Sequence, residues 1–349
     1  MAGVTYKCPN CGAYLTFDPD SQQWKCPFCS SAFPETELKG KAEAFQKEAD
    51  KEAEQSSGAQ VVYHCPSCGS EIMTDETTVA THCYYCHSPV VLQGKLTADM
   101  KPDEVLPFTI GKEKAIEEIS EWIRTRKFVP KKFFSKAQIQ EMSGVYYPHF
   151  VSECQTEGVL DGEATTSDVF DEGKYVVTNT RHYHVRREGR FVFKDILRPA
   201  LSKANRKLTE GVHPFPLEDA KPFSGAFLSG FLAERRDLEA DSYRQEIEQE
   251  LQGYMNSMLR DTASQYQTCS ASTTATVKKI KTKYVLLPTW VLTYPNKQKP
   301  DEPYYYAMNG CTGEVCGKLP IDKRKLRRTA LLVGGVVFAL CCLLGYFLF

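Results

Sequence analysis

The chain has 349 residues, of which 42% are hydrophobic and 25% are charged, and its formal net charge is −1. These values exclude wholesale disorder, which requires low hydrophobicity and a high net charge. They allow one substantial folded core beside smaller modules.

Eight cysteines form a duplicated pattern near the N-terminus. Each copy has two Cys-x-x-Cys pairs separated by 14 residues, and the second copy follows the first after 57 residues. A Cys-x-x-Cys turn places two sulfurs on one side of a metal, and a hairpin returns the second turn to complete a tetrahedron. The pattern therefore predicts two structural Zn²⁺ ions, bound by Cys8, Cys11, Cys26 and Cys29 and by Cys65, Cys68, Cys83 and Cys86.

Two alternatives to zinc stay open at this stage. Disulfides or reactive thiols explain the duplication at one period less well than metal sites do. Four thiolates suit iron as well as zinc. Since each ribbon is small, we expect the metal to supply most of its folding free energy, on the order of 10 kcal/mol, so that chelation would unfold both. Gly12 and Gly69 suit a left-handed backbone after each leading pair, whereas the trailing pairs lack such a glycine.

The predicted boundaries place the first ribbon at residues 1–34, a helical linker at 35–60 and the second ribbon at 61–94. The linker carries an apolar stripe of helical spacing among lysines and glutamates, made of Leu38, Ala42, Phe45, Ala49 and Ala53. A solvated spacer helix is the expected role, and a docking stripe for a partner is the alternative.

Residues 104–320 mix the two kinds of periodicity and predict an α+β domain. Helical spacing marks Ala115 to Ile123, Phe227 to Arg235 and Glu239 to Arg260. Alternating or apolar runs predict strands at 145–152, 174–187, 190–197, 273–281, 285–294, 304–308 and 314–318. We expect a hairpin turn at Glu188-Gly189 and, because Pro148 and Pro288 cannot donate to a ladder, edge or bulged strands around them.

The C-terminal segment predicts a transmembrane helix. Residues 329–349 carry no charge over a length that matches a hydrocarbon core of about 30 Å. Five cations precede it, and we expect them to face the cytoplasm and to contact anionic lipid headgroups: Lys323, Arg324, Lys325, Arg327 and Arg328. The predicted location is the cell membrane, with a single pass and a cytoplasmic N-terminus.

The motifs and charges of the sequence limit the classes of function that we expect. It has no phosphate-binding loop, nucleophile elbow or His-Glu-x-x-His motif, so we expect no enzyme, no catalytic residue and no organic cofactor. Nucleic-acid binding is disfavoured because the ribbons carry few lysines and arginines to meet phosphates. The expected function is a membrane-anchored adaptor or scaffold that docks proteins. The alternatives are a membrane-tethered nucleic-acid binder and an enzyme with an unrecognised site in the central domain.

Four features together resemble a bacterial family of membrane-anchored proteins with transcription-factor-IIB-type tandem zinc ribbons, some of which are labelled primosomal replication-restart helicases. These features are the two ribbons, the run 222–234, the hairpin 304–313 and the terminal segment. The resemblance implies the eight cysteines as metal ligands and phage-shock-type or flotillin-like membrane proteins as partners. It brings no catalytic residues.

Overall fold

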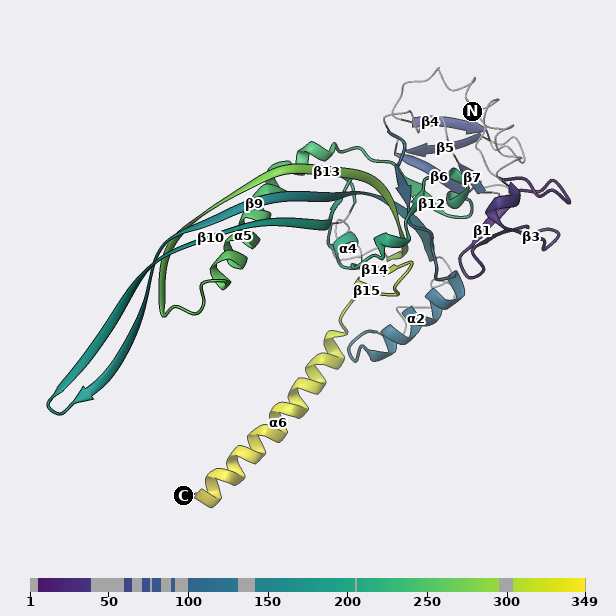
Figure 1. Cartoon of the computed structure of the whole chain (residues 1–349). Helices are drawn as coiled ribbons and strands as arrows, with labels where there is room; N and C mark the ends of the chain where they lie inside the picture. The colour runs from purple at the N-terminus through teal and green to yellow at the C-terminus, as the bar shows by residue number, and fades with distance from the viewer. Residues whose placement is uncertain are drawn as a thin grey trace.

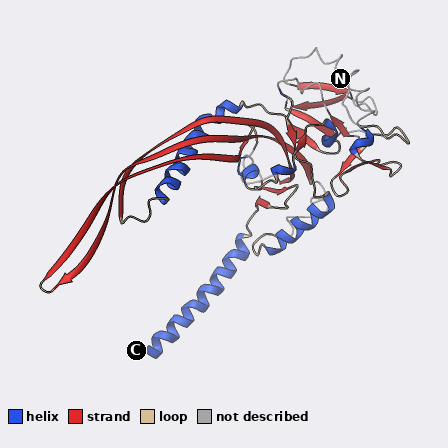
Figure 2. Cartoon of the chain, viewed as in Figure 1, coloured by secondary structure: helices blue, strands red, loops and turns tan. Residues whose placement is uncertain are grey.

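The protein is rich in β-structure, as Figure 2 shows. About 44% of the described residues lie in strands. The structure is a computed structural model, and it describes residues 6–38, 60–64, 71–75, 77–82, 89–91, 100–130, 142–204, 206–294 and 304–348. The predicted fold class is wrong in its terminal helix, as described below, while the mixture of helices with a large sheet in the central region is observed.

Three very long antiparallel strands dominate the molecule (Figure 1). They are β9 (Ser143–Glu172), β10 (Tyr175–Pro199) and β13 (Thr268–Tyr294). β9 lies between the other two and pairs with both along most of its length. The predicted turn at Glu188-Gly189 is wrong, because β10 runs through it and Gly189 pairs with Gly158. The chain reverses instead at Gly173, whose φ of 65° suits a tight turn.

One face of this curved sheet is covered by α5 (Arg244–Asp261), as Figure 1 shows. The helix buries one residue per turn along a single stripe, at Ile247, Leu251, Met255 and Leu259. These side chains pack on apolar residues of the three strands, including Cys154 and Leu160. The predicted helix at 239–260 is therefore confirmed in its main part, and its first turn is the 3₁₀ helix η5 (Ala240–Tyr243).

The wide end of the sheet forms the main core. Short strands, among them β6 (Thr78–His82) and β7 (Pro89–Val91), complete it beside β9 and β13. The strand order is β11-β8-β13-β9-β12-β6-β7, and β14 and β15 extend the sheet from β13. Their bounds are β8 Glu104–Val105, β11 Lys221–Pro222, β12 Leu232–Glu234, β14 Tyr304–Asn309 and β15 Val315–Lys318. Helix α2 (Lys112–Thr125) packs Ala115 and Ile119 into this core, as its spacing predicts.

The remaining connections are short helices. They are α4 (Arg206–Glu210), η3 (Leu217–Asp219) and η4 (Gly225–Leu228). The predicted helix at Phe227–Arg235 is wrong, since this segment is the end of η4 followed by β12. Its apolar residues are spaced for burial in the core, and pairing of β12 with β6 and β9 overrides their helical periodicity.

The two strand prolines do not mark edge strands. Pro148 lies in β9 and Pro288 in β13, and these strands pair with each other in the middle of the sheet. Each proline comes directly beside the last paired residue of another neighbour: His149 pairs with Pro199 of β10, and Thr289 pairs with Asn309 of β14. The carbonyl oxygens of Pro148 and Pro288 still accept from the N–H groups of Ala200 and Gly310, each at 2.9 Å. The missing N–H is tolerated because it lies at the last step of each ladder.

The ribbon strands flank this core. The first ribbon contains β1 (Thr16–Asp18), β2 (Gln23–Lys25) and β3 (Ala32–Phe33) in one small sheet. From the second copy, β4 (Gln60–His64) and β5 (Glu71–Asp75) form a two-stranded sheet. Strands β6 (Thr78–His82) and β7 (Pro89–Val91) join the large sheet through β12. Most of the predicted linker lies outside the described residues. Its first residues, 35–38, are helical with Leu38 buried, and its last, Gln60, already belongs to β4.

Helix α6 (Lys323–Leu348) leaves the body at the C-terminal end (Figure 1). Within the part of the chain that the structure describes, no helix combines the length and the apolar character needed to cross a membrane. Helix α6 begins with the five exposed cations of the predicted basic cluster, Lys323, Arg324, Lys325, Arg327 and Arg328. The predicted transmembrane helix at 329–349 is thus contradicted, and the single-pass membrane location is withdrawn with it. Lipid binding by the cations stays a prediction.

Candidate metal centre

Cys8, Cys11, Cys26 and Cys29 converge as their spacing predicts. Their sulfur atoms all lie within 4.8 Å of one another. Cys8 Sγ is 3.5 Å from Cys29 Sγ, and Cys11 Sγ is 3.4 Å from Cys26 Sγ. A disulfide requires about 2.05 Å, so these thiols are not bonded to each other. Four sulfurs at about 2.3 Å from one Zn²⁺ would be roughly 3.8 Å apart, which this arrangement fits. The four cysteines could hold one metal ion.

Two turns of the same geometry carry the four sulfurs. In the first, Cys8 N–H donates to the Ala13 carbonyl at 2.7 Å and Gly12 N–H donates to the Cys8 carbonyl at 2.9 Å. In the second, Cys26 N–H donates to the Ser31 carbonyl at 2.8 Å and Ser30 N–H donates to the Cys26 carbonyl at 3.0 Å. The second turn thus repeats both backbone hydrogen bonds of the first turn.

In each turn, the fourth residue after the first cysteine has a left-handed backbone conformation. Gly12 has φ 76°, as its type predicts, and Ser30 takes φ 59° at the equivalent position. The trailing turn therefore adopts the same conformation without a glycine. A single non-glycine residue in this region costs about 1 kcal/mol, and the two hydrogen bonds of the turn hold it there.

Ser31 acts directly on one of the sulfurs. The hydroxyl and the backbone N–H of Ser31 lower the pKa of Cys29 from its ordinary value of 9.0 to about 6, because they stabilise the thiolate. The backbone amide of Ala13 lowers the pKa of Cys11, but the neighbouring thiols outweigh it and raise that pKa to about 12. Cys29 therefore forms a thiolate readily, whereas the ionisation of Cys11 is opposed by the neighbouring sulfurs. A cation at the centre would remove this conflict, since it compensates the charge of all four.

The ribbon is not an independent module, because its strand face is built into the core of the central region. Trp24 is almost fully buried, and its indole N–H donates to the Ala226 carbonyl at 3.0 Å. Its ring centroid lies 5.3 Å from that of Phe227. Phe17 N–H donates to the Ser229 carbonyl at 3.0 Å, and Ser229 Oγ donates to the Leu15 carbonyl at 2.6 Å.

A second set of contacts ties the β1–β2 turn to the body. Asp20 Oδ1 accepts from Gly111 N–H at 3.2 Å, and Gln22 Nε2 donates to the Phe108 carbonyl at 2.7 Å. The segment that receives the ribbon, 224–229, lies inside the run 222–234 that contributes to the family resemblance. Its apolar composition and its serines are the sequence signal for this contact, but nothing local in the sequence assigns it to the ribbon.

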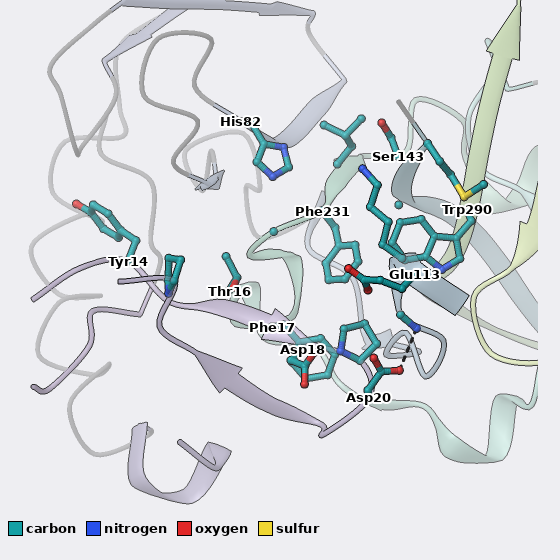
Figure 3. Close-up of a pocket in the computed structure, with 18 of the residues that line it drawn as sticks. Tyr14, Thr16, Phe17, Asp18, Asp20, His82, Glu113, Ser143, Phe231 and Trp290 are labelled. Carbon is teal, nitrogen blue, oxygen red and sulfur yellow. Dashed lines mark hydrogen bonds between the residues drawn. The ribbon is translucent and has the colours of Figure 1, made fainter. Parts of the chain in front are cut away.

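A pocket of about 950 Å³ opens between the ribbon and the body (Figure 3). Tyr14 and Asp18 line it from the ribbon side, and Phe231 and Trp290 from the body. Phe28, in the turn between Cys26 and Cys29, also lines it and is 80% exposed. The exposed phenylalanine beside the metal ligands is a residue whose role the spacing of the cysteines does not reveal.

Cys65, Cys68, Cys83 and Cys86 lie outside the described residues, so the second zinc site stays a prediction. Cys311 and Cys316 are separate packed thiols: Cys311 Sγ donates to the Pro107 carbonyl at 3.2 Å and Cys316 Sγ to the Leu208 carbonyl at 3.5 Å. Burial raises the pKa of Cys311 to about 12 and that of Cys316 to about 11.

His182 and His184 alternate on the exposed strand β10 beside Arg181, Arg186 and Arg187. His184 Nε2 lies 3.1 Å from Asp161 Oδ1, and Arg186 Nη1 lies 3.1 Å from the other oxygen of the same carboxylate. Arg181 pairs with Asp168 at 3.0 Å, so carboxylates already contact His184 and two of the three arginines.

No protein-family model matches the chain, and no solved structure matches it. The chain is similar to a protein of Bacillus subtilis (strain 168) that bears the name "Uncharacterized protein YdjG". The two are 28% identical over 324 residues, which make up 93% of this chain and 92% of the relative. That name assigns no activity to the relative. The first cysteine cluster is compatible with a zinc ribbon, whereas the transcription-factor-IIB-type family, with its phage-shock-type and flotillin-like partners, stays a prediction.

Proposed function

We propose that this protein is an adaptor that binds protein partners at its first zinc ribbon and at the pocket beside it. The exposure of Phe28 carries the proposal. Phe17 and Trp24 of the same ribbon are buried, whereas Phe28 is 80% exposed on a turn that bears two metal ligands. An exposed aromatic side chain beside a concave surface that contains other aromatic residues is typical of the centre of a protein interface.

Zinc is the metal that we assign to Cys8, Cys11, Cys26 and Cys29. Its role would be structural, because a tetrahedral site with four thiolates leaves no open position for a substrate. It would hold the turn of residues 26–29 in place and thereby present Phe28. By the duplication of the cysteine pattern, we propose the same metal for the second set.

The charges of the ribbon favour a protein partner over nucleic acid. Lys25 Nζ lies 2.6 Å from Asp18 Oδ2, and Lys7 Nζ lies 5.7 Å from the centre of the Tyr14 ring. Both cations of the described ribbon are therefore engaged. The pocket wall contains Asp18, Asp20 and Glu113 against Lys7 and Lys112, so its formal charge is −1. A phosphate backbone requires the opposite sign. An apolar side chain of a peptide, entering between Phe28 and Phe231, suits the pocket better.

Selection from a displayed random-peptide library on the zinc-loaded protein tests the proposal. We expect enriched peptides whose binding falls at least tenfold with Phe28→Ala, which is about 1.4 kcal/mol. Tyr254→Ala is the matched control, since Tyr254 is an exposed aromatic residue on α5, away from the pocket. Peptides that bind both variants alike would refute docking at Phe28. DNA binding whose affinity falls steeply with salt would instead favour the nucleic-acid alternative.

A further inference from the structure

The hairpin formed by β9 and β10 extends beyond the sheet as a two-stranded arm (Figure 1). β13 begins at Thr268, which pairs with Thr165, so residues 166–172 and 175–181 pair with each other and with no third described strand. Seven extended residues correspond to about 24 Å of projecting arm. A two-stranded hairpin arm of this kind is only marginally stable in water by itself.

The backbone pairing between β13 and the outer edge of β9 ends near Thr165. Gln267 N–H donates to the Thr165 carbonyl at 2.9 Å, and the Gln267 side chain continues the ladder by one step: its Oε1 accepts from Ser167 N–H at 2.5 Å and its Nε2 donates to the Ser167 carbonyl at 2.8 Å. Because backbone groups alternate in direction along a strand, those of Val169 and Asp171 face the same edge. No described strand covers them.

β10 presents a second open edge. Among the described strands it pairs with β9 alone. The register places Val176, Thr178 and Thr180 with their backbone groups directed away from β9, since the alternate residues bond to β9. The tip of the arm is also apolar: Tyr175 and Val176 are 76% and 69% exposed, and Val169 is 65% exposed. Open edges with apolar side chains are templates for pairing with another strand.

The charges of the two open edges are opposite in sign. Residues 166–172 carry three acidic residues and no basic one, which are Asp168, Asp171 and Glu172. The open edge of β10 is longer: within the arm it carries Arg181, and up to residue 190 it adds Arg186, Arg187, Glu188 and Arg190, a balance of +3 over residues 175–190. These groups are largely solvent-exposed, and their pairs within the hairpin, such as Arg181 with Asp168 at 3.0 Å, leave both side chains more than half exposed.

This pattern selects one mode of pairing between copies. Two β9 edges facing each other would oppose −3 with −3, and two β10 edges would oppose +3 with +3, so both symmetric modes are repelled. We infer that the arm is a self-association surface, in which the acidic β9 edge of one copy pairs with the basic β10 edge of a second copy of this chain. Such a head-to-tail contact leaves one edge free at each end, so the assembly grows beyond a dimer.

Sedimentation velocity on the full chain tests this inference. For a monomer of 39.4 kDa, we expect the mass of the wild type to rise past the dimer with protein concentration and to fall as NaCl increases, because exposed charges are screened. Val169→Pro removes a donor that faces the open edge and none that serves the hairpin. Asp171→Lys reverses one edge charge. Each should raise the dissociation constant about tenfold or more.

Glu117→Lys, an exposed charge reversal on α2, is the matched control and should behave as the wild type does, with far-UV circular dichroism confirming that every variant is folded. A wild type that stays monomeric at all concentrations would overturn the inference, and so would one that stops at a dimer. Association that persists unchanged in both edge variants, as contact through the exposed apolar residues of α6 would give, would overturn it as well.

Discussion

The indole N–H of Trp24 donates to the carbonyl oxygen of Ala226 at 3.0 Å, although the two residues are separated by 202 positions in the chain. This bond joins the metal-bearing ribbon to the body from within the core, where both partners are shielded from water. It means that the ribbon and the central region share one hydrophobic cluster. The stability of the ribbon is therefore coupled to that of the body.

Replacing Trp24 tests this coupling. Trp24→Ala should destabilise the protein by about 3–5 kcal/mol, because it removes a buried aromatic side chain and leaves a cavity. Trp24→Phe keeps most of the packing and loses the bond to Ala226, at a cost of about 1–3 kcal/mol, since the carbonyl is left unpaired in the core. Urea unfolding measures both. If Trp24→Ala cost less than 1 kcal/mol, the ribbon would not be packed on the body as described.

Metal removal should loosen the turns and spare the strands, which differs from the complete unfolding that the sequence alone predicts. With a chelator, the amides of Cys8, Gly12, Cys26 and Ser30 should exchange quickly, because the turns lose the ion that braces them. The amide of Phe17, which donates to Ser229 at 3.0 Å, should stay protected. Hydrogen exchange followed by mass spectrometry distinguishes the two results. Loss of protection throughout residues 16–25 would restore the simpler expectation.

The left-handed residues of the two turns give a matched pair of substitutions. Ser30→Gly should stabilise the protein by about 0.5–1 kcal/mol, because glycine accepts φ 59° without strain. Gly12→Ala should destabilise it by about 1 kcal/mol or more for the converse reason at φ 76°. Thermal unfolding of the zinc-loaded protein measures both. The same sign for the two changes would contradict the equivalence of the turns.

His149 predicts an acid-dependent loss of stability. Its ring is buried and its Nε2 has no hydrogen-bond partner in the described structure, and burial lowers its pKa from 6.5 to about 4. Since the unfolded state binds the proton more tightly, the stability is fully present above pH 6.5 and is lost as the pH falls toward 4. The loss is on the order of 3 kcal/mol.

His149→Leu should remove this part of the pH dependence while keeping the volume of the site approximately. Urea unfolding of both proteins at pH 7 and at pH 4.5 measures it, with His182→Leu on the exposed strand as the matched control. An equal loss of stability between these pH values in the wild type and in His149→Leu would show that another group is responsible.

The sequence by itself determined the parts of this protein that depend on local geometry and chemistry. The spacing of Cys8, Cys11, Cys26 and Cys29 was sufficient to predict their convergence. A four-residue Cys-x-x-Cys turn fixes the positions of two sulfurs, and cysteines have few other reasons to recur at such intervals. The apolar spacing of α2 and of α5 was sufficient for the same reason, since a helix is built from neighbours in the chain.

Tertiary structure alone decided where those parts are placed. The ribbon packs on residues about 200 positions away, β6 joins the large sheet through Ala233, and Glu188-Gly189 continues a strand where its composition favours a turn. In each case long-range pairing and burial outweigh a local preference of about 1 kcal/mol. Likewise the run of uncharged residues at the C-terminus indicated a membrane span, which the helices of the described structure do not provide. The hydrophobic pattern of a sequence predicts which residues are buried. Only the tertiary structure decides which residues they pack against.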